Sequence, residues 1–224
     1  MNGQTSSAVL LLALTSGAGL RAQPSRADPV DVQSRLGVQL NLNLAKTWDG
    51  SVGYEGHMTG NSAVYRGSYL SAELGHALGK HLTVFANYRL AKVSEAVSHR
   101  YGLGAELEAK RHHLTLSFRP TFQYQRKVLD DGEQGSPGVV RTRVRAKVPV
   151  TKHLTFYGSV EPYFAFTGLY PVDNWRNTAG VQWEIRKHLQ LDLHYIYRQD
   201  YEKIYNRTYH IFGVEFSIDR KFPR

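Results

Sequence analysis

Basic residues alternate with apolar or small ones through RTRVRAKVPV, residues 141–150. If this segment is a β-strand, successive side chains point to opposite faces, so Arg141, Arg143, Arg145 and Lys147 share one face. Guanidinium and ammonium groups bind carboxylates and phosphates, so the chemistry open to this ladder is anion binding. The alternation fits a soluble sheet with its charges outward and a membrane barrel with its charges inward equally well.

The segments expected to flank this ladder carry few acids. Arg119 adds a fifth cation, and Glu161 is the one carboxylate among the expected neighbours. Such cations must reach across an enclosed interior or hold solutes and water. Two alternatives follow. One is a narrow channel whose basic strip offers transient sites to small anionic solutes such as acidic oligosaccharides. The other is a closed barrel held by a salt-bridge network.

A different chemistry would use a nucleophile. Ser159 and His194, with Glu161 or Glu184, supply the residue types of a lipid-modifying outer-membrane hydrolase, which would need them near the lipid boundary. Their spacing is not diagnostic, so we assign no catalytic residue and keep the hydrolase as an alternative. The sequence has no phosphate loop, dinucleotide fingerprint or HExxH motif, and we expect neither a cofactor nor a metal.

Composition limits the class of protein. The 224 residues are 42% hydrophobic, which is too apolar for a disordered chain and enough for one substantial domain. The absence of cysteine excludes disulfides, thiolate metal sites and a cysteine nucleophile. A net charge of +9 permits binding to nucleic acid or anionic headgroups. Because most bases fall on the face opposite the aromatic residues, we expect no nucleic-acid partner.

The N-terminal segment MNGQTSSAVLLLALTSGAGLRAQ carries a short apolar run followed by small residues. This pattern predicts a signal peptide over residues 1–22, then an N-terminal segment at 23–34 and a barrel at 35–222. Past it, no apolar stretch approaches the roughly 20 residues of a membrane helix. The mean hydropathy of −0.41 still permits a membrane barrel, because half of each barrel strand is polar.

Strand-like alternation recurs almost to the end of the chain. It predicts eleven strands, at residues 35–44, 49–58, 65–78, 81–92, 99–110, 113–127, 139–150, 153–166, 175–186, 189–200 and 208–219. Their lengths suit tilted membrane strands, which need about 9 to 11 residues, better than ordinary globular strands of about five or six.

The connections between these strands are of two kinds. Short ones such as LGKHLTV (78–84), VTKHLTF (150–156) and IRKHLQL (185–191) place a basic residue and then His before Leu. Longer ones, such as LDDGEQGSPG (129–138), are rich in turn residues. Short turns on one rim and long loops on the other are typical of outer-membrane barrels. We interpret the turn Lys and His as rim residues that reach the lipid headgroups, in preference to metal ligands.

The two faces of the predicted strands differ in character. One carries Leu, Val and aromatic residues, and its aromatics gather toward the long-loop ends as an interfacial girdle: Tyr88, Tyr101, Phe122, Phe164, Trp175 and Tyr197. The other carries the basic strip and the acids Glu55, Glu73, Glu106, Glu108, Glu161, Glu184, Asp192 and Glu215. We therefore expect the valines of the ladder to face lipid and its cations to face the lumen.

These patterns predict an all-β protein, a closed antiparallel up-and-down transmembrane β-barrel. Bacterial barrels have even strand numbers, so we expect about 12 strands, with 10 as the alternative, although eleven are found. The soluble alternative is a large lipocalin-like barrel or sandwich whose core is the apolar face.

Several segments resemble the outer-membrane β-barrel family catalogued as domain of unknown function 2490. They are RTRVRAKV, SVEPYF (159–164), NWRNTAGVQWEI (174–185), HYIYRQDY (194–201) and HIFGVEFSI (210–218). The resemblance covers roughly residues 36–222. It implies an exported Gram-negative barrel of unestablished activity, located in the outer membrane, in contact with lipid and inserted by the barrel-assembly machinery. The chain departs from the usual barrel ending because Pro223 and Arg224 follow Phe222.

Overall fold

The computed structural model describes residues 30–93, 96–129, 132–135, 138–166, 172–201 and 206–221. The predicted signal peptide 1–22, and residues 23–29 of the predicted N-terminal segment, lie outside the described residues. Within the described ranges, no helix is long and apolar enough to cross a membrane.

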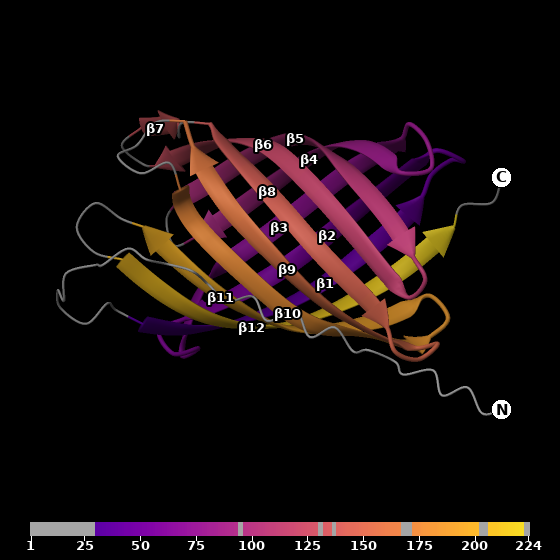
Figure 1. The fold of residues 1–224 in the computed structure, drawn as a ribbon. Helices are drawn as coiled ribbons and strands as arrows, with labels where there is room; N and C mark the ends of the chain where they lie inside the picture. The colour runs from indigo at the N-terminus through magenta and orange to yellow at the C-terminus, as the bar shows by residue number, and fades with distance from the viewer. Residues whose placement is uncertain are drawn as a thin grey trace, which may run out of the picture.

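The fold is built from β-strands (Figure 1). They are β1 (Val30–Asn43), β2 (Trp48–Thr59), β3 (Val64–Ala77), β4 (Leu82–Val93), β5 (Ala96–Arg111), β6 (Leu114–Leu129), β7 (Gly132–Gly135), β8 (Val139–Pro149), β9 (Leu154–Ala165), β10 (Val172–Arg186), β11 (Leu189–Tyr201) and β12 (Asn206–Lys221). Every predicted strand overlaps one of these. The first begins at Val30, five residues before the predicted barrel boundary at residue 35.

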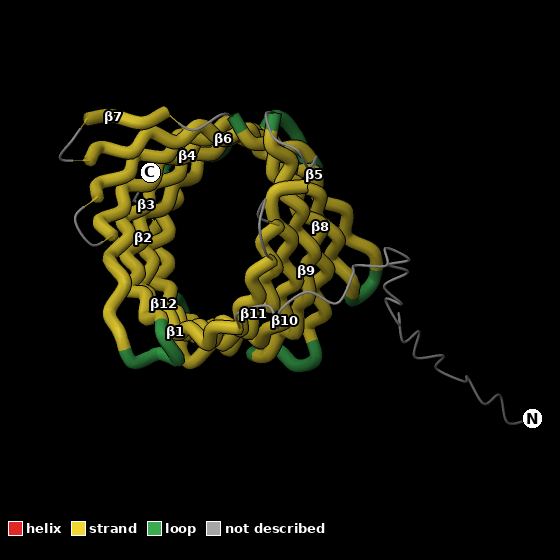
Figure 2. The backbone as a smooth tube through the Cα atoms, turned by 90° about the vertical axis from the view of Figure 1, so that its left-hand side faces the viewer, coloured by secondary structure: helices red, strands yellow, loops and turns green. Residues whose placement is uncertain are grey.

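Eleven of the strands close into a barrel, seen as a ring in Figure 2. The order is β5-β4-β3-β2-β1-β12-β11-β10-β9-β8-β6, and β6 pairs with β5 to complete it. Among the described strands, the short β7 pairs with the end of β6 alone. The predicted closed barrel is confirmed, and its strand number is close to the expected twelve.

One pairing departs from the expected antiparallel pattern. β1 and β12 run parallel, from Val30 opposite Thr208 to Asn43 opposite Lys221. The reason is topological. Hairpin-connected strands alternate in direction, so with eleven wall strands the first and last must point the same way. The described residues form eleven wall strands, an odd number where bacterial barrels have an even one, and the parallel seam follows from that odd number.

The strands define two rims. We call the end at residues 44–47, 78–81, 112–113, 150–153 and 187–188 the short-turn rim. We call the opposite end, where β1 and β12 begin, the long-loop rim; it carries the connection from β6 to β8 and that from β9 to β10. In Figure 1 the long-loop rim is on the left and the short-turn rim on the right.

The repeated basic–His–Leu turns share one backbone arrangement at the short-turn rim. The carbonyl groups of His81, His153 and His188 accept the backbone N–H of Glu108, Glu184 and Asp219 at 2.8, 2.8 and 2.9 Å. In each case the acceptor lies in a turn, and the donor lies on the second strand after that turn. Each turn therefore adds one backbone hydrogen bond to the sheet. Across the described chain, no group of three or more His, Asp or Glu could hold a metal ion.

Alternation gives the wall two unlike faces. The outer face exposes large apolar side chains, among them Leu36, Val38, Leu103, Leu116, Val144 and Phe212. The inner face carries polar ones, and the buried polar residues Gln33, Ser117, Thr121, Glu161 and Asp192 belong to it. This is the reverse of a soluble core, in which the apolar face would be buried.

Large inward side chains lie beside glycines on neighbouring strands. The cross-strand pairs are Phe85 with Gly104, Asn87 with Gly102, Tyr157 with Gly180 and His194 with Gly213. A Cβ atom on Gly104 would lie 2.5 Å from the carbonyl oxygen of Pro120 and 2.6 Å from Cζ of Phe85. Pairing large with small residues lets bulky side chains fit a narrow interior without separating the strands.

We therefore predict that Gly104→Ala destabilises the barrel by about 1–3 kcal/mol, because the new methyl meets backbone that cannot move aside. The measurement is the urea dependence of the folded band on unheated gels. Gly79→Ala is the matched control, since nothing lies within 4 Å of a Cβ there. Equal stability of the two variants would contradict the packing role of Gly104.

Candidate functional site

The barrel interior, the lumen, contains two cavities. The loop-side cavity, near the long-loop rim, has a volume of about 590 Å³, and the turn-side cavity has about 570 Å³. Both are lined by Arg35, Arg89, Arg100, Gln123 and Arg176. We call these five shared residues the junction, because the cavities meet there.

Both cavities are lined by more bases than acids. The loop-side cavity has seven Arg or Lys side chains against one acid, Asp173. The turn-side cavity has nine against five. Walls of low dielectric focus the field of such charges, so an anion is favoured along the lumen and most strongly in the loop-side cavity.

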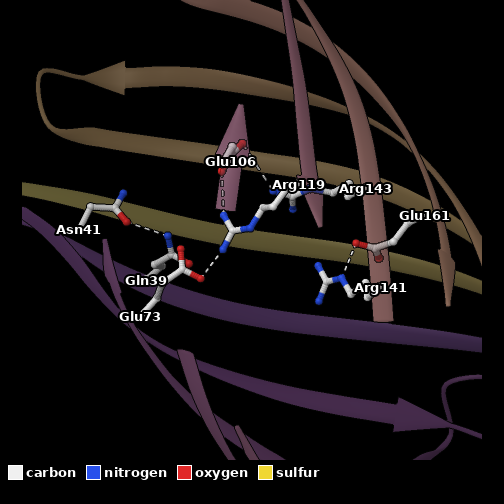
Figure 3. A network of polar contacts seen from close by, with 8 residues as sticks. All are labelled: Gln39, Asn41, Glu73, Glu106, Arg119, Arg141, Arg143 and Glu161. Carbon is white, nitrogen blue, oxygen red and sulfur yellow. Dashed lines mark hydrogen bonds and ion pairs between the residues drawn. The ribbon is translucent and has the colours of Figure 1, made fainter. Parts of the chain in front are cut away.

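The ladder on β8 lines the turn-side cavity through Arg141, Arg143, Arg145 and Lys147. Arg141 Nε donates to Glu161 Oε1 at 2.5 Å, and Nη2 of Arg143 lies 4.0 Å from Glu106 Oε1. Arg145 and Lys147 have no acidic partner within 4 Å in the described residues. The ladder is thus neutralised at one end and carries unpaired charge at the other (Figure 3 shows its paired end).

Arg119, on β6, links three strands (Figure 3). Its Nη1 donates to Glu106 Oε2 on β5 at 3.0 Å, and its Nη2 pairs with Glu73 on β3. The guanidinium carbon lies 3.7 Å from the ring centroid of Phe85 on β4. Because this side chain is part of a satisfied network, we assign it a structural role in the wall.

Other predicted acids bind neighbours in the lumen. Glu55 Oε2 accepts from Arg89 at 2.6 Å and lies 2.8 Å from His57 Nε2. Glu215 lies opposite Asp192 in the β11–β12 register and accepts from Ser217 Oγ at 3.4 Å.

Asp192 is bound by three side chains. It accepts from Tyr157 Oη at 2.8 Å and Gln182 Nε2 at 3.0 Å, and it lies 2.8 Å from His194 Nδ1. Glu55, Glu73, Glu161, Asp192 and Glu215 all line the turn-side cavity.

Three predicted lumenal acids line neither cavity: Glu106, which is paired with Arg119, and the two acids Glu108 and Glu184. Glu108 and Glu184 are exposed near the short-turn rim. Glu184 Oε2 lies 3.6 Å from His153 Nδ1. Both residues have the inward parity, but their strands extend beyond the enclosed section, so they belong to the rim.

Several arginines are stacked on aromatic rings. The guanidinium carbon of Arg176 lies 4.4 Å from the centroid of Tyr163, and that of Arg145 lies 4.8 Å from Tyr157. A ring face attracts a cation and fixes its plane, but it adds no negative charge. These stacks therefore orient guanidiniums while preserving their positive charge.

Four cations that line the loop-side cavity were not expected in the lumen from the alternation: Arg35 and Arg176 in the junction, and Arg66 and Lys127 outside it. Arg35 stood at the first position of a strand predicted too short, where alternation is least visible. Arg176 shares the parity of Thr178 and Gln182, so strict alternation could have assigned it to the lumen.

Most residues of the alternative hydrolase face the lumen. Ser159 and His194 line the turn-side cavity. They stand on β9 and β11, two strands apart, and the residue level with His194 on β9 is Tyr157. Strand spacing of about 4.8 Å puts the two backbones roughly 10 Å apart. The ring of His194 is oriented by Asp192, and Glu184 lies at the rim.

The predicted aromatic girdle lies toward the long-loop ends of its strands, and of its six residues only Tyr88 is among those that line a cavity, the turn-side one. Tyr101, Phe122 and Phe164 are exposed, whereas Tyr88, Trp175 and Tyr197 are partly covered. Ring contacts join neighbours in this band, with centroids 5.4 Å apart for Tyr88 and Tyr101.

Comparison with known proteins gives a family. The model of the family described as "Protein of unknown function (DUF2490)" matches residues 32–209, which is most of the barrel. The chain belongs to the DUF2490 family. A search of curated proteins gave no match for this DUF2490 chain.

Solved structures give the fold of this DUF2490 barrel. It is similar to a structure described as "NanC porin structure in rhombohedral crystal form", with a TM-score of 0.51 and 13% identity, covering 75% of this chain and 86% of that one. A second similar structure is OccAB4 of Acinetobacter baumannii, with a TM-score of 0.35 and 14% identity, covering 75% of this chain and 51% of that one.

We predict that Arg119→Gln destabilises the DUF2490 barrel by about 1–3 kcal/mol, because Glu73 and Glu106 would lose their shared cation in a partly enclosed site. The control is Glu184→Gln, which breaks an exposed pair and should cost less than about 1 kcal/mol. Urea titration of the refolded variants measures both. A smaller loss for Arg119→Gln than for Glu184→Gln would refute the structural role of Arg119.

Proposed function

We propose that this DUF2490 barrel is a Gram-negative outer-membrane protein that conducts small anionic solutes through a narrow lumen. The membrane part of the proposal is supported by the outer face. Its exposed side chains are mainly leucine, valine and aromatic residues, and such a surface would associate or aggregate in water. A closed wall satisfies the backbone hydrogen bonds that lipid cannot satisfy.

Lipid is then the partner of the outer face, and the aromatic girdle would lie at the headgroups near the long-loop rim. Bacterial barrels place their short turns in the periplasm and their longer loops outside. We therefore assign the long-loop rim to the cell exterior, with insertion by the barrel-assembly machinery.

The observation that carries the transport proposal is the charge of the loop-side cavity, with seven basic side chains and one acid. An incoming solute would meet this cavity first. Positive potential at an entrance concentrates anions and repels cations, so it favours anion entry.

The width of the barrel favours small solutes. Barrels of about eight strands are filled by side chains, whereas those of 16 to 18 strands hold an open aqueous channel. Eleven strands lie between these limits. The solved barrel of similar fold is described as a porin, which agrees with a conducting role.

The location can be tested by fractionation. We expect the full chain to be extracted from outer membranes only with detergent. We also expect it to migrate faster on unheated gels, because a closed barrel resists unfolding in mild detergent. Recovery in the soluble fraction, with no shift on heating, would contradict the membrane assignment.

Conduction can be tested in planar bilayers. The reversal potential in a KCl gradient should show anion preference, and Arg143→Ala combined with Arg145→Ala should lower the anion-to-cation permeability ratio by about two- to fivefold. The control, Lys46→Ala with Lys152→Ala, removes two charges from the short-turn rim and should change the ratio less.

The competing alternative is a closed barrel whose lumenal charges serve stability alone. It predicts no conductance from correctly folded protein. Conductance without anion preference would also end the proposal.

A further inference from the structure

We infer that Arg35, Arg100 and Arg176 form a binding site across the lumen for the phosphate, sulfate or carboxylate group of a small solute. The three residues stand on β1, β5 and β10. Around the ring, β5 is four strands from β1, β10 is four strands from β5, and three further steps lead back to β1. The three side chains therefore approach the lumen from three sides of the wall.

All three residues line both cavities, so they stand at one level. Their charges act on one another across the lumen: Arg35 and Arg100 each experience the positive charge of Arg176. A solute moving between the cavities must pass this triad.

The triad has no close carboxylate partner, and Glu55 and Glu161 act on Arg35 and Arg176 only from beyond 4 Å. None of its members has a carboxylate within 4 Å in the described chain, whereas the neighbouring Arg89 is paired with Glu55 at 2.6 Å. The Nε atoms of Arg35 and Arg176 are also buried, with no hydrogen-bond partner among the residues that the structure describes. Like charges that converge in an enclosed site destabilise the fold unless an anion offsets them.

The chemistry of the triad selects the ligand class. A guanidinium presents a planar fork of N–H donors that matches two oxygens of a carboxylate, phosphate or sulfate. Arg176 is held over Tyr163, so its plane is fixed while its charge is kept. Three forks arriving from three directions suit an oxyanion of charge −2 better than chloride, which offers no separate oxygens.

The inference deepens the proposed channel, but binding itself does not require conduction. Isothermal titration calorimetry of the folded full chain in detergent tests it, with inorganic phosphate and succinate as separate probes and potassium chloride as the comparison. We expect saturable binding of phosphate, succinate or both, at one site per chain. Saturation by phosphate alone or succinate alone identifies the oxyanion group that is preferred.

Arg35→Gln, Arg100→Gln and Arg176→Gln should each weaken binding by about tenfold or more, as expected when a charge-assisted hydrogen bond is lost. Arg66→Gln is the matched control, because Arg66 carries the same charge but lines the loop-side cavity and not the turn-side one. It should change the affinity by less than about threefold, through the long-range field only.

Arg176→Lys is a second variant, for the case in which Arg176→Gln does not fold. It keeps the charge but removes the fork, so we expect weaker phosphate binding with anion preference unchanged in bilayers. Equal effects of Arg66→Gln and the triad variants, or no saturable binding in folded protein, would overturn the site. Absence of conductance alongside saturable binding would end the proposed channel function and leave the site standing.

Discussion

The pairing that closes the sheet, β1 with β12, is the interaction on which the rest of the structure depends. Without it, β1 and β12 would each present a free edge of unpaired N–H and C=O groups, and the inner face would open to the outside. Once the ring is closed, every side chain faces either inward or outward. A two-residue period in the sequence then suffices to separate leucine and valine from arginine and glutamate. The apolar side chains lie on the outer face, and the charged ones are enclosed in the lumen.

Within that enclosed space the arginines differ in whether a carboxylate lies within reach. Arg119 and Arg141 are fixed by carboxylates, which neutralises them and ties neighbouring strands together. Arg145 and Arg176 are fixed against tyrosine rings and retain their charge. Whether an arginine has a carboxylate or an aromatic ring as its partner therefore sets the local electrostatic potential, even between regions that contain the same number of arginines. Carboxylates therefore tie neighbouring strands together, whereas the arginines held by rings alone keep their positive charge.

Much of this architecture could be predicted from alternation alone. The β8 ladder and the apolar stripe of Leu36, Val38 and Leu40 have a period of two that no helix would produce. What alternation cannot give is the direction of the closing pair, because parallel and antiparallel strands show the same pattern. Nor can it show which cations share a level. Arg35, Arg100 and Arg176 are far apart in sequence and line the same section of the lumen only because the ring brings β1, β5 and β10 around one axis. Glu184 was expected in the lumen because its parity is inward, yet it lies at the rim. Parity does not tell where the enclosed section of the barrel ends.

The odd strand count has a consequence for how the barrel is completed. The described wall begins at Val30 on the long-loop rim and ends at Lys221 on the short-turn rim, so the seam joins the first strand to the last along their whole length. The seam hydrogen bond from Asn41 Nδ2 to Asp219 Oδ1, 2.8 Å long, spans 178 residues of sequence, whereas the other wall pairings join strands that are neighbours along the chain apart from the short β7. Loop-closure entropy grows with the length of chain enclosed, so neighbouring strands can pair at lower entropic cost than the seam. The seam is thus the last pairing expected to form. The arginine triad, which needs β1, β5 and β10 around one lumen, can exist only after that step.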